Sequence, residues 1–546
     1  MYDLKRIISE IIQFNQNNGN NSIELRLNES QRRAVELIKA AYDTQGIGVV
    51  QGPPGTGKTT VVTKGIDELL SRIEHDKHVK LVYVAPTDKL VVDTYAQILL
   101  LRQFTDFNDV IRRTRILASQ VGPDDVVSAL RAPVNDDVEF IITTEFQNIY
   151  SNKSGYDYVI IVDEASKSPI YRFLTPTSLE LIRSVKLGYK VAIDSLSVVG
   201  DPMQAISLEE IYRKIRDYLL MERLLRSILS DAGVDPTMLR KHDACESIYT
   251  YILNEEAQSK LQNFQMLDIT YRLPSPSHEI ISKGFYGGLL RSYYSVRDRL
   301  SFDDNLLSQL PDCLGDSKIA KAVIDAVKDQ IGVIYIDTRE YAYNNEYGLN
   351  IDARRAYIAI EAAIISSITT GKSTTILPIY RDMVNYIKFV IKTDTRYSSC
   401  IKKLESVGIK ISVTTAHAML GSEDYNIVAV LGKEYLLSDV NGLRKPTIYF
   451  KEPEIFNVQF SRHKGLLIIV GNVERLARNA RSFMHDFIKK SKVNPNMNSP
   501  MKMQLLCSSQ KINESTSAIL DLCGMELKNK KARIVRDTGS CKVVQL

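Results

Sequence analysis

Ten short apolar runs, rich in β-branched residues and separated by helical patterns, constrain how this chain can fold. Such alternation is typical of parallel sheets whose faces are covered by helices. The runs fall into two groups of five, so the sequence predicts an α/β fold with two sheet-containing domains. The first group covers 46–50, 81–85, 140–144, 158–162 and 196–200, and the second covers 332–336, 374–379, 411–415, 427–431 and 466–470.

The domain boundaries follow from where these runs stop. We expect the first α/β domain over residues 27–205 and the second over residues 263–480. Between them, "LEEIYRKIRDYLLMERLLRSILSDAG" has apolar residues at helical spacing and no strand signal, which predicts a helical connector or insertion at 206–262. A helical segment is expected at 1–26, and a C-terminal extension at 481–546 carries no functional signal.

The composition is that of an ordinary globular chain. Apolar residues make up 44% and charged residues 25%, which excludes disorder, collagen and a coiled coil as the main architecture. No run reaches about 18 apolar residues and the N-terminus lacks a signal-peptide core, so we expect a cytoplasmic protein without a membrane partner. The net charge of +5 permits nucleic acid as a partner, but only at a local basic patch.

The cysteines indicate no metal site. They lie far apart and form no C-x-x-C pair, so neither a zinc ribbon nor an iron–sulfur cluster is predicted. We expect reduced, mostly buried thiols at all six positions: Cys245, Cys313, Cys400, Cys507, Cys523 and Cys541.

The stretch "GVVQGPPGTGKTT" predicts a phosphate-binding loop between a strand and an amphipathic helix. Glycines let backbone amides close around a phosphate, and the helix N-terminus adds partial positive charge. Lys58 can reach the terminal phosphates, and the Thr59 hydroxyl can bind Mg²⁺. A chance Gly-rich turn is the alternative, which the strand-loop-helix context disfavours. The nucleotide contacts predicted here are Gly52, Pro53, Pro54, Gly55, Thr56, Gly57, Lys58, Thr59 and Thr60.

A pair of carboxylates closes another apolar run, in "YVIIVDEAS". Asp163, at the carboxyl end of a buried parallel strand, can hold Mg²⁺, and Glu164 can orient or deprotonate the attacking water. A solvated acidic turn is the alternative. The loop and this pair predict a nucleoside triphosphatase, but they do not separate a helicase from a GTPase, a transporter motor or an AAA-type ATPase.

The order of further polar stretches resembles that of superfamily 1 helicases. The forms "GPPGTGKT", "DEAS", "FYGGLL" and "LIIVGN" resemble the up-frameshift-like branch, and the resemblance covers about residues 27 to 473. It implies two RecA-like domains with ATP between them, single-stranded DNA or RNA across their top, and movement usually 5′ to 3′. The stretches are "LNESQRRAV" (27–35), "APTDKLVVDTY" (85–95), "IITTE" (141–145), "GDPMQ" (200–204), "DITYRLPSP" (268–276), "TTAHAMLGSE" (414–423) and "VQFSRHKG" (458–465).

The resemblance assigns roles to individual side chains near the nucleotide. Gln31 would read adenine, Gln204 would sense the γ-phosphate, and Tyr271 would stack on the base. Arg272 and Arg462 would bring positive charge to the γ-phosphate, with Arg462 as the arginine finger. The alternatives are a polar helix start for Gln31, a simple turn for Gln204 and a surface pair for Tyr271 and Arg272.

The stretch "TTAHAMLGSE" fits the pattern T-x-H-x-x-x-G-x-E. Thr415 and His417 would bond the nucleic-acid backbone, and Glu423 resembles the residue that binds the ribose or links the ATP site to the track. His417 could instead be a packed structural histidine. The branch commonly has Gln or Lys before the glycine, whereas this chain has Leu420, which cannot donate to phosphate.

Four more residues follow strands where the family grips the nucleic-acid backbone: Pro86, Thr87, Thr143 and Thr144. Short polar residues after strands are also common without function. In "SRHKG", only Arg462 is expected to be catalytic. We expect His463 and Lys464 to be solvated charges at the entrance of a strand, with Lys464 facing solvent or nucleic acid.

The sequence therefore predicts an ATP- and Mg²⁺-dependent helicase or translocase that works as a monomer on single-stranded DNA or RNA. Lys58, Glu164, Gln204, Arg272 and Arg462 would be its catalytic residues. A clamp or nucleoprotein remodeller that does not separate strands is the alternative, because only about 26 residues precede the Gln31 motif. An ATP-gated binding protein with weak hydrolysis is a third interpretation, supported by Leu420 alone.

Overall fold

The computed structural model describes residues 3–18, 25–74, 76–117, 125–132, 134–144, 156–165, 192–204, 263–314, 317–338, 350–416, 418–419, 421–432, 437–438, 444–445, 448–493, 500–528 and 531–545. The described residues up to Asp268 form one compact unit, and those from Ile269 onward form a second. Within the described residues, no helix is long and apolar enough to cross a membrane.

The first unit is built on a parallel sheet. Within its described residues seven strands pair in the order β3-β4-β2-β5-β6-β1-β7, and every pairing is parallel. Parallel strands gather their carboxyl ends along one edge, where ligands of such folds bind. The strands are β1 (Ile47–Gln51), β2 (Val79–Ala85), β3 (Thr114–Leu117), β4 (Phe140–Thr144), β5 (Asp157–Val162), β6 (Ala192–Gly200) and β7 (Phe264–Met266).

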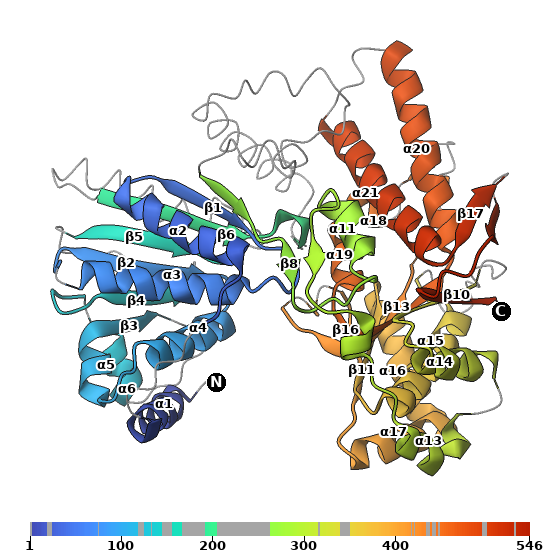
Figure 1. The fold of residues 1–546 in the computed structure, drawn as a ribbon, viewed down its shortest axis with the longest axis horizontal. Helices are drawn as coiled ribbons and strands as arrows, with labels where there is room; N and C mark the ends of the chain where they lie inside the picture. The colour runs from blue at the N-terminus through green and yellow to red at the C-terminus, as the bar shows by residue number, and fades with distance from the viewer. Residues whose placement is uncertain are drawn as a thin grey trace. The chain divides into compact units, whose positions relative to one another are not determined.

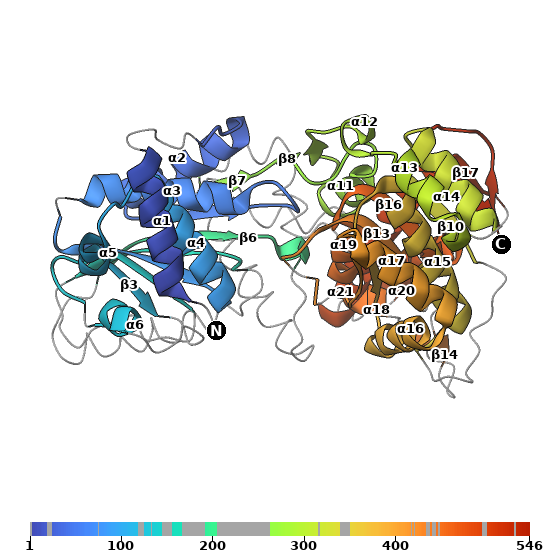
Figure 2. The ribbon, with the colours of Figure 1, turned by 90° about the horizontal axis from the view of Figure 1, so that it is seen from below.

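Helices cover one face of this sheet, and Figure 1 shows α2, α3 and α4 in front of the strands. Figure 2 shows α1 beside α4, and the two helices pack together. Leu81 and Tyr83 of β2 face this helical layer, whereas Val82 and Val84 join an apolar cluster on the other face. Burial on both faces explains why the strands read as unbroken apolar runs. The helices are α1 (Leu4–Asn18), α2 (Glu29–Asp43), α3 (Lys58–Ile73), α4 (Asp88–Leu101), α5 (Phe107–Arg113) and α6 (Asp125–Leu130), with the short helix η1 at Pro202–Gln204.

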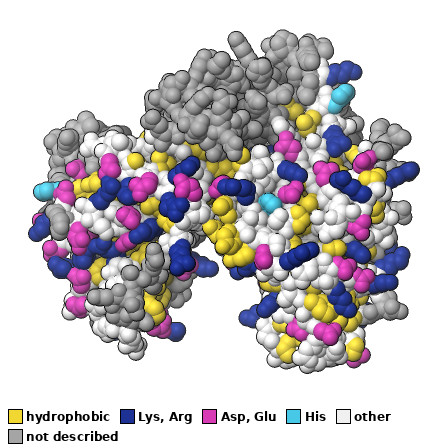
Figure 3. Space-filling view, viewed as in Figure 1, with side chains coloured by type: hydrophobic (Ala, Val, Ile, Leu, Met, Phe, Trp, Pro, Cys, Tyr) yellow, Lys and Arg dark blue, Asp and Glu magenta, His cyan; other side chains and the backbone are white. Residues whose placement is uncertain are grey.

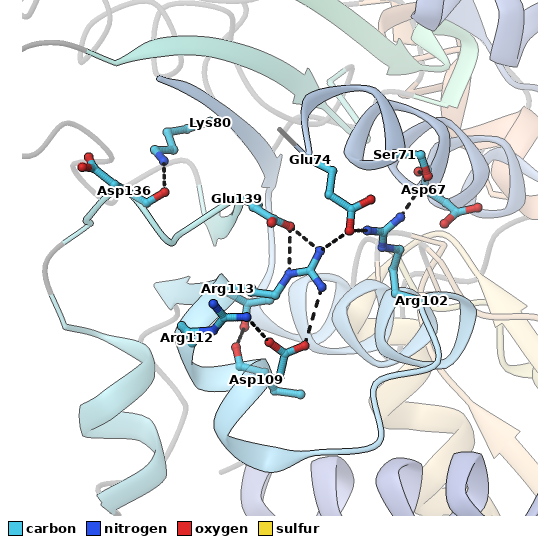
Figure 4. A network of polar contacts seen from close by, with 12 residues as sticks. Asp67, Ser71, Glu74, Lys80, Arg102, Asp109, Arg112, Arg113, Asp136 and Glu139 are labelled. Carbon is cyan, nitrogen blue, oxygen red and sulfur yellow. Dashed lines mark hydrogen bonds and ion pairs between the residues drawn. The ribbon is translucent and has the colours of Figure 1, made fainter. Parts of the chain in front are cut away.

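The amino edge of the first sheet carries a network of ion pairs (Figure 4). Arg113, just before β3, bonds Glu139 through Nε at 3.0 Å and through Nη2 at 2.7 Å. Its Nη2 also lies 3.3 Å from a Glu74 oxygen, and its Nη1 lies 3.5 Å from an Asp109 oxygen. Arg102 reaches the same Glu74 carboxylate at 3.6 Å. The network ties the starts of neighbouring strands to the helices around them.

The second unit is built on another parallel sheet. Within its described residues six strands pair in the order β12-β11-β13-β16-β10-β19, all parallel. Helix α15 is buried along most of its length and packs against β11 and β13. The strands are β10 (Val333–Asp337), β11 (Thr374–Pro378), β12 (Ile411–Val413), β13 (Asp424–Val430), β16 (His463–Gly471) and β19 (Cys541–Gln545).

Helices and small strand pairs surround this second sheet. Figure 1 shows α20 beside α21, and these two helices pack on each other. The helices are α11 (Glu279–Phe285), α12 (Val296–Arg299), α13 (Asp304–Gln309), η3 (Pro311–Cys313), α14 (Lys318–Lys328), α15 (Ala353–Thr370), α16 (Arg381–Thr393), α17 (Thr395–Ser406), α18 (Ile448–Lys451), α19 (Glu454–Phe460), α20 (Val473–Val493) and α21 (Pro500–Leu522). The small strands are β8 (Ile269–Thr270), β9 (Arg291–Ser292), β14 (Leu437–Ser438), β15 (Arg444–Lys445), β17 (Met525–Lys528) and β18 (Lys531–Ile534).

The predicted fold class is confirmed, because all ten apolar runs form strands of two parallel sheets. The boundaries differ from the expected ones. Strand β7 pairs with β1, so the first unit reaches Asp268 and the second begins at Ile269 rather than at 263. The expected extension 481–546 contributes β19 to the second sheet, beside β10. Strand β7 has only three residues, and the β19 segment "CKVVQ" mixes polar with apolar residues, so neither stands out as an apolar run. The connector expected at 206–262 lies outside the described residues.

The expectation of reduced thiols is wrong for four cysteines. Cys313 pairs with Cys400 and Cys523 pairs with Cys541 in disulfides, with Cα atoms 5.7 and 4.7 Å apart. The first pair is 87 residues apart in the chain, a separation that only the tertiary fold can close.

On the face of the first unit seen in Figure 3, Lys and Arg side chains are interspersed with Asp and Glu, as the small net charge suggests.

Candidate functional site

The loop between β1 and α3 has the backbone of a phosphate cradle. Gly55 and Gly57 adopt φ values of 70° and 81°, a left-handed conformation that favours glycine. Gly57 caps α3, so the helix begins at Lys58, and the first N–H groups of a helix have no partner within it. Such an N-terminus attracts anions, as the sequence predicts for this loop.

Lys58 folds back onto the start of its own loop. Its Nζ donates to the carbonyl oxygen of Gly52 at 2.5 Å. A Cβ at position 52 would lie 2.0 Å from the Lys58 Cγ, so this path requires glycine. Buried Thr56 donates its hydroxyl to the Pro53 carbonyl at 2.8 Å, which fixes the middle of the loop. The lysine is therefore held beside the cradle by a neutral acceptor that a phosphate can replace.

The remaining loop residues surround this lysine. Pro54 is buried, whereas Thr59 and Thr60 are partly exposed in the first turn of α3. The Thr59 carbonyl accepts a hydrogen bond from the Thr63 hydroxyl at 2.7 Å. The Thr59 hydroxyl, the predicted magnesium ligand, thus lies directly after Lys58 on the exposed end of the helix.

Gln31 connects the start of α2 to the phosphate loop. Its Oε1 accepts from the Asn28 N–H at 3.0 Å, and its own N–H donates to the Asn28 Oδ1 at 2.9 Å, which completes a capping box. Its Nε2 donates to the Thr56 carbonyl at 3.0 Å. A Cβ at Gly57 would lie 2.5 Å from this Nε2. Because the amide nitrogen carries two hydrogens, the predicted adenine contact can coexist with the Thr56 bond.

Asp163 ends β5 as a buried carboxylate, 2% exposed. Its Oδ2 accepts from the Tyr83 hydroxyl at 3.0 Å, and its Oδ1 accepts from the Glu164 N–H at 2.7 Å. Burial and then the charge of Glu164 raise the pKa of Asp163 to about 6, while these two hydrogen bonds and the charge of Lys58 act in the opposite direction. A carboxylate deprived of solvent in this way gains from a cation ligand.

Glu164 has a left-handed backbone, with φ of 48° although it is not glycine. This conformation is uncommon for a side chain with a Cβ and is often found at functional sites. The turn separates the two carboxylates, because Asp163 is buried whereas Glu164 is partly exposed. That separation suits one carboxylate for a metal ion and the other for water.

Gln204 is held by a buried carboxylate that follows β6. Its Nε2 donates to the Asp201 Oδ2 at 2.5 Å. The other oxygen, Oδ1, accepts from the Met203 N–H at 3.2 Å and from the Gln51 Nε2 at 3.4 Å. Gln51 is the last residue of β1, directly before the phosphate loop. The predicted phosphate sensor is therefore connected to the strand that carries the loop.

The adjacent order β5-β6-β1 brings these groups to one edge of the sheet. Asp163 follows β5, Asp201 follows β6, and the phosphate loop follows β1. This edge combines anion-binding backbone, a lysine, a buried carboxylate and an amide. Such a set can bind a nucleotide phosphate chain with a divalent cation and orient a water molecule against it.

The predicted nucleic-acid contacts of the first unit have mixed environments. Pro86 is partly exposed, and Thr87 is exposed and caps α4 by accepting from the Leu90 N–H at 3.4 Å. Thr143 and Thr144 are buried at the end of β4. The Thr143 hydroxyl is 3.2 Å from the Leu117 carbonyl oxygen and 3.0 Å from that of Thr144. Their contacts to nucleic acid stay predictions.

In the second unit, Tyr271 and Arg272 follow the short strand β8. The Tyr271 ring lies 5.0 Å from that of Tyr293, which is 62% exposed. Arg272 donates through Nε to a Glu423 oxygen at 2.6 Å and through Nη1 to the Ser461 carbonyl at 3.3 Å. Tyr271 thus lies against an exposed aromatic ring, whereas Arg272 belongs to a cluster of ion pairs.

Glu423 lies between two cations. While Arg272 binds its Oε2, the Lys464 Nζ lies 2.5 Å from its Oε1. Burial raises the pKa of Glu423, but the opposing effects of Arg272 and Lys464 are larger together, so its pKa is lowered. The predicted ribose contact stays a prediction, and in the structure both carboxylate oxygens are engaged by side chains of the same unit.

The environment of His463 in "SRHKG" differs from the predicted one, and the side chains of both Arg462 and His463 are buried. Arg462 is 2% exposed and its Nη1 donates to the Ser422 carbonyl at 3.4 Å. His463 is fully buried, and its Nε2 lies 2.7 Å from the Ser277 hydroxyl. Burial, followed by the charge of Arg272, lowers the pKa of His463 to about 3. The expectation of a solvated charge at His463 is therefore wrong, because the side chain starts an interior strand and stays neutral.

The structure describes only part of the stretch "TTAHAMLGSE". The Thr415 hydroxyl accepts from the Ala418 N–H at 3.3 Å, so it forms a local turn. His417 and Leu420 lie outside the described residues. The backbone contact predicted for Thr415 stays a prediction.

The sequence did not predict several residues that shape the edge formed by β5, β6 and β1 and the ion pairs around Glu423. Gln51 and Asp201 could have been noticed as polar residues at the ends of apolar strands. Tyr83 gave no signal, because an aromatic residue inside a buried strand is ordinary core. The partnership of Lys464 with Glu423 joins residues of separate motifs and has no local sequence signature.

Comparison with known proteins adds to this geometry. Two family models, each described as an AAA domain, match residues 26–141 and 249–474. The search of curated proteins gave no match. Among solved structures, the chain is similar to S. cerevisiae Dbp5 bound to RNA and ADP BeF3, with 10% sequence identity, a TM-score of 0.39, and coverage of 90% of this chain and 97% of that chain.

Proposed function

Because this chain belongs to the up-frameshift-like branch of superfamily 1 helicases, we propose that it hydrolyses ATP to move along single-stranded DNA or RNA in the 5′ to 3′ direction. The observation that carries the proposal is the edge formed by β5, β6 and β1, which presents the phosphate loop, a buried carboxylate and an anchored amide together. The resemblance to that branch supports the proposed direction and track, and the site geometry supports the proposed chemistry.

In the proposed reaction, water attacks the γ-phosphate in line with the leaving ADP. Lys58 exchanges the Gly52 carbonyl for phosphate oxygens, and Glu164 accepts the proton of the attacking water. Gln204, held by Asp201, bonds the γ-phosphate and the water. Thr59 and Asp163 would hold Mg²⁺, which neutralises phosphate charge when bound.

The second unit would supply charge and position. Tyr271 stacks on the base, and the guanidinium groups of Arg272 and Arg462 stabilise the charge that develops on the γ-phosphate. Because these groups and the phosphate loop belong to separate units, hydrolysis can be coupled to closure and reopening of the two. That cycle would ratchet a single strand past a monomer. Its backbone would be gripped by Pro86, Thr87, Thr143, Thr144, Thr415 and His417.

The deciding experiment measures ATPase stimulation and strand displacement on matched duplexes with a 5′ or a 3′ tail, made of DNA or RNA. We expect stimulation by single strands and displacement from the 5′ tail. The Lys58→Ala protein is the control and should lose both activities. Stimulated ATPase without displacement from either tail would instead indicate a clamp or remodeller. ATPase that survives Lys58→Ala would refute the proposed site.

A further inference from the structure

The side chain of Lys464 lies in the same ion cluster as Arg272, one of the two arginines predicted to reach the γ-phosphate. Glu423 joins them, since its Oε2 accepts from the Arg272 Nε at 2.6 Å and its Oε1 lies 2.5 Å from the Lys464 Nζ. Arg272 is 13% exposed in its side chain, against 35% for Glu423 and 39% for Lys464. The arginine is thus the inner member and the lysine the outer one.

The geometry leaves part of Arg272 available for a ligand. Its Nε is used by Glu423 and its Nη1 by the Ser461 carbonyl. Within the described residues, its Nη2 makes no hydrogen bond. A guanidinium that is fixed at two nitrogens and open at the third is oriented in advance for an anion.

The charge balance of the cluster depends on Lys464. Arg272 and Lys464 are cations, Glu423 is the carboxylate that both of them contact, and His463 is buried beside Arg272 as a neutral ring. These three charged groups give an excess of one positive charge. Without Lys464, Glu423 would offset Arg272, and the attraction of Arg272 for a phosphate would weaken.

We propose that Lys464 is a positioning residue for ATP hydrolysis, because its ion pair with Glu423 holds the carboxylate that orients Arg272 and offsets its negative charge. This inference rests on the proposed function. Lys464 acts through Glu423 and does not touch the nucleotide. Its effect belongs to the chemical step, where charge develops on the γ-phosphate, and not to ground-state binding of ATP.

The chain offers a matched control for a merely structural ion pair. Lys283 pairs with Glu279 at 2.7 Å, with side-chain exposures of 48% and 35%, and both residues lie on α11 of the same unit. This pair resembles the Lys464 pair in length and exposure but is not joined to Arg272. Lys283→Met therefore reports what loss of an exposed ion pair does by itself.

The test measures kcat and KM for ATP, with single-stranded nucleic acid at saturation, in four single variants. We expect Lys464→Met to lower kcat about tenfold with KM within twofold of the parent protein. Lys464→Arg should keep kcat within about threefold, because the cation is retained. Lys283→Met should leave both constants unchanged. Lys58→Ala, run beside them, tests the proposed function independently.

A double variant separates positioning from structure. In a Glu423→Gln background there is no negative charge to offset, so adding Lys464→Met should not lower kcat further. An equal loss in both backgrounds, or a normal kcat in Lys464→Met while Lys58→Ala is inactive, would overturn the inference and leave the proposed function standing. If Lys58→Ala retains full ATPase activity, the proposed function itself fails.

Discussion

The amino edges of the two sheets both carry arginines paired with carboxylates, yet the two edges differ in the balance of positive and negative charge. At the first, Arg102, Arg112 and Arg113 meet three carboxylates, those of Glu74, Asp109 and Glu139, and the charges cancel (Figure 4). At the second, the cluster of Arg272, Glu423 and Lys464 has more cations than carboxylates.

This difference separates a structural role from a ligand-binding one. A balanced network satisfies its own charges and gains nothing from an added anion. A cluster with excess positive charge, fixed by one carbonyl and one shared carboxylate, is stabilised further when a phosphate arrives. Paired arginines alone therefore do not indicate function, and the residual charge must be counted.

The largest effect is expected at the second edge. Arg272→Ala should lower kcat about a thousandfold, the magnitude found for arginines that stabilise phosphoryl transfer. Circular dichroism should show a folded protein, because the side chain lies at the margin of the core. ATPase and melting measurements on the same preparation check both points, and a near-normal kcat would remove Arg272 from the mechanism.

Arg113→Met at the first edge should behave in the opposite way. It removes a largely buried guanidinium from Glu139, Glu74 and Asp109, which should lower the free energy of unfolding by about 1–2 kcal/mol. ATPase at a temperature well below the transition should stay within twofold of the parent. Urea unfolding measures the change in the free energy of unfolding. A large loss of kcat with unchanged stability would contradict the structural role.

His463 tests whether the second edge tolerates another cation. Its pKa of about 3 lies below the ordinary 6.5, so the unfolded chain binds a proton more readily than the folded protein. Stability should therefore fall as pH decreases below about 6.5. His463→Gln should flatten this dependence between pH 5 and 7, whereas exposed His485→Gln should not. Melting temperatures across that range decide the point, and parallel curves for all three proteins would count against it.

The smallest effect is expected for Arg112→Met. Its Nη2 lies 2.7 Å from an Asp109 oxygen, as close as the Arg113 contact to Glu139, but its side chain is 59% exposed. Solvent screens such a pair, so the melting temperature should move by less than about 1 °C. A shift as large as that of Arg113→Met would show that distance matters more than burial in this network.

Much of the fold and part of the site could be predicted from local sequence. The ten apolar runs and the glycines at 55 and 57 encode strand burial and backbone conformation directly, because each depends on a few neighbouring residues. Asp163 could be placed for the same reason, at the end of its strand. The neutral state of His463 could not, since "SRHKG" looks the same whether its strand starts at the surface or in the interior.

By itself, the sequence determined two parallel α/β sheets and a phosphate loop, because chain direction, glycine positions and apolar periodicity are local properties. Only the tertiary structure decided which charge offsets which. Gln51 meets Asp201 across 150 residues, and Arg272 meets Glu423 across 151. It also brought Cys313 to Cys400 and carried β19 back into the second sheet. Electrostatic partners are chosen by distance in space, and that distance is set only when the strands pair.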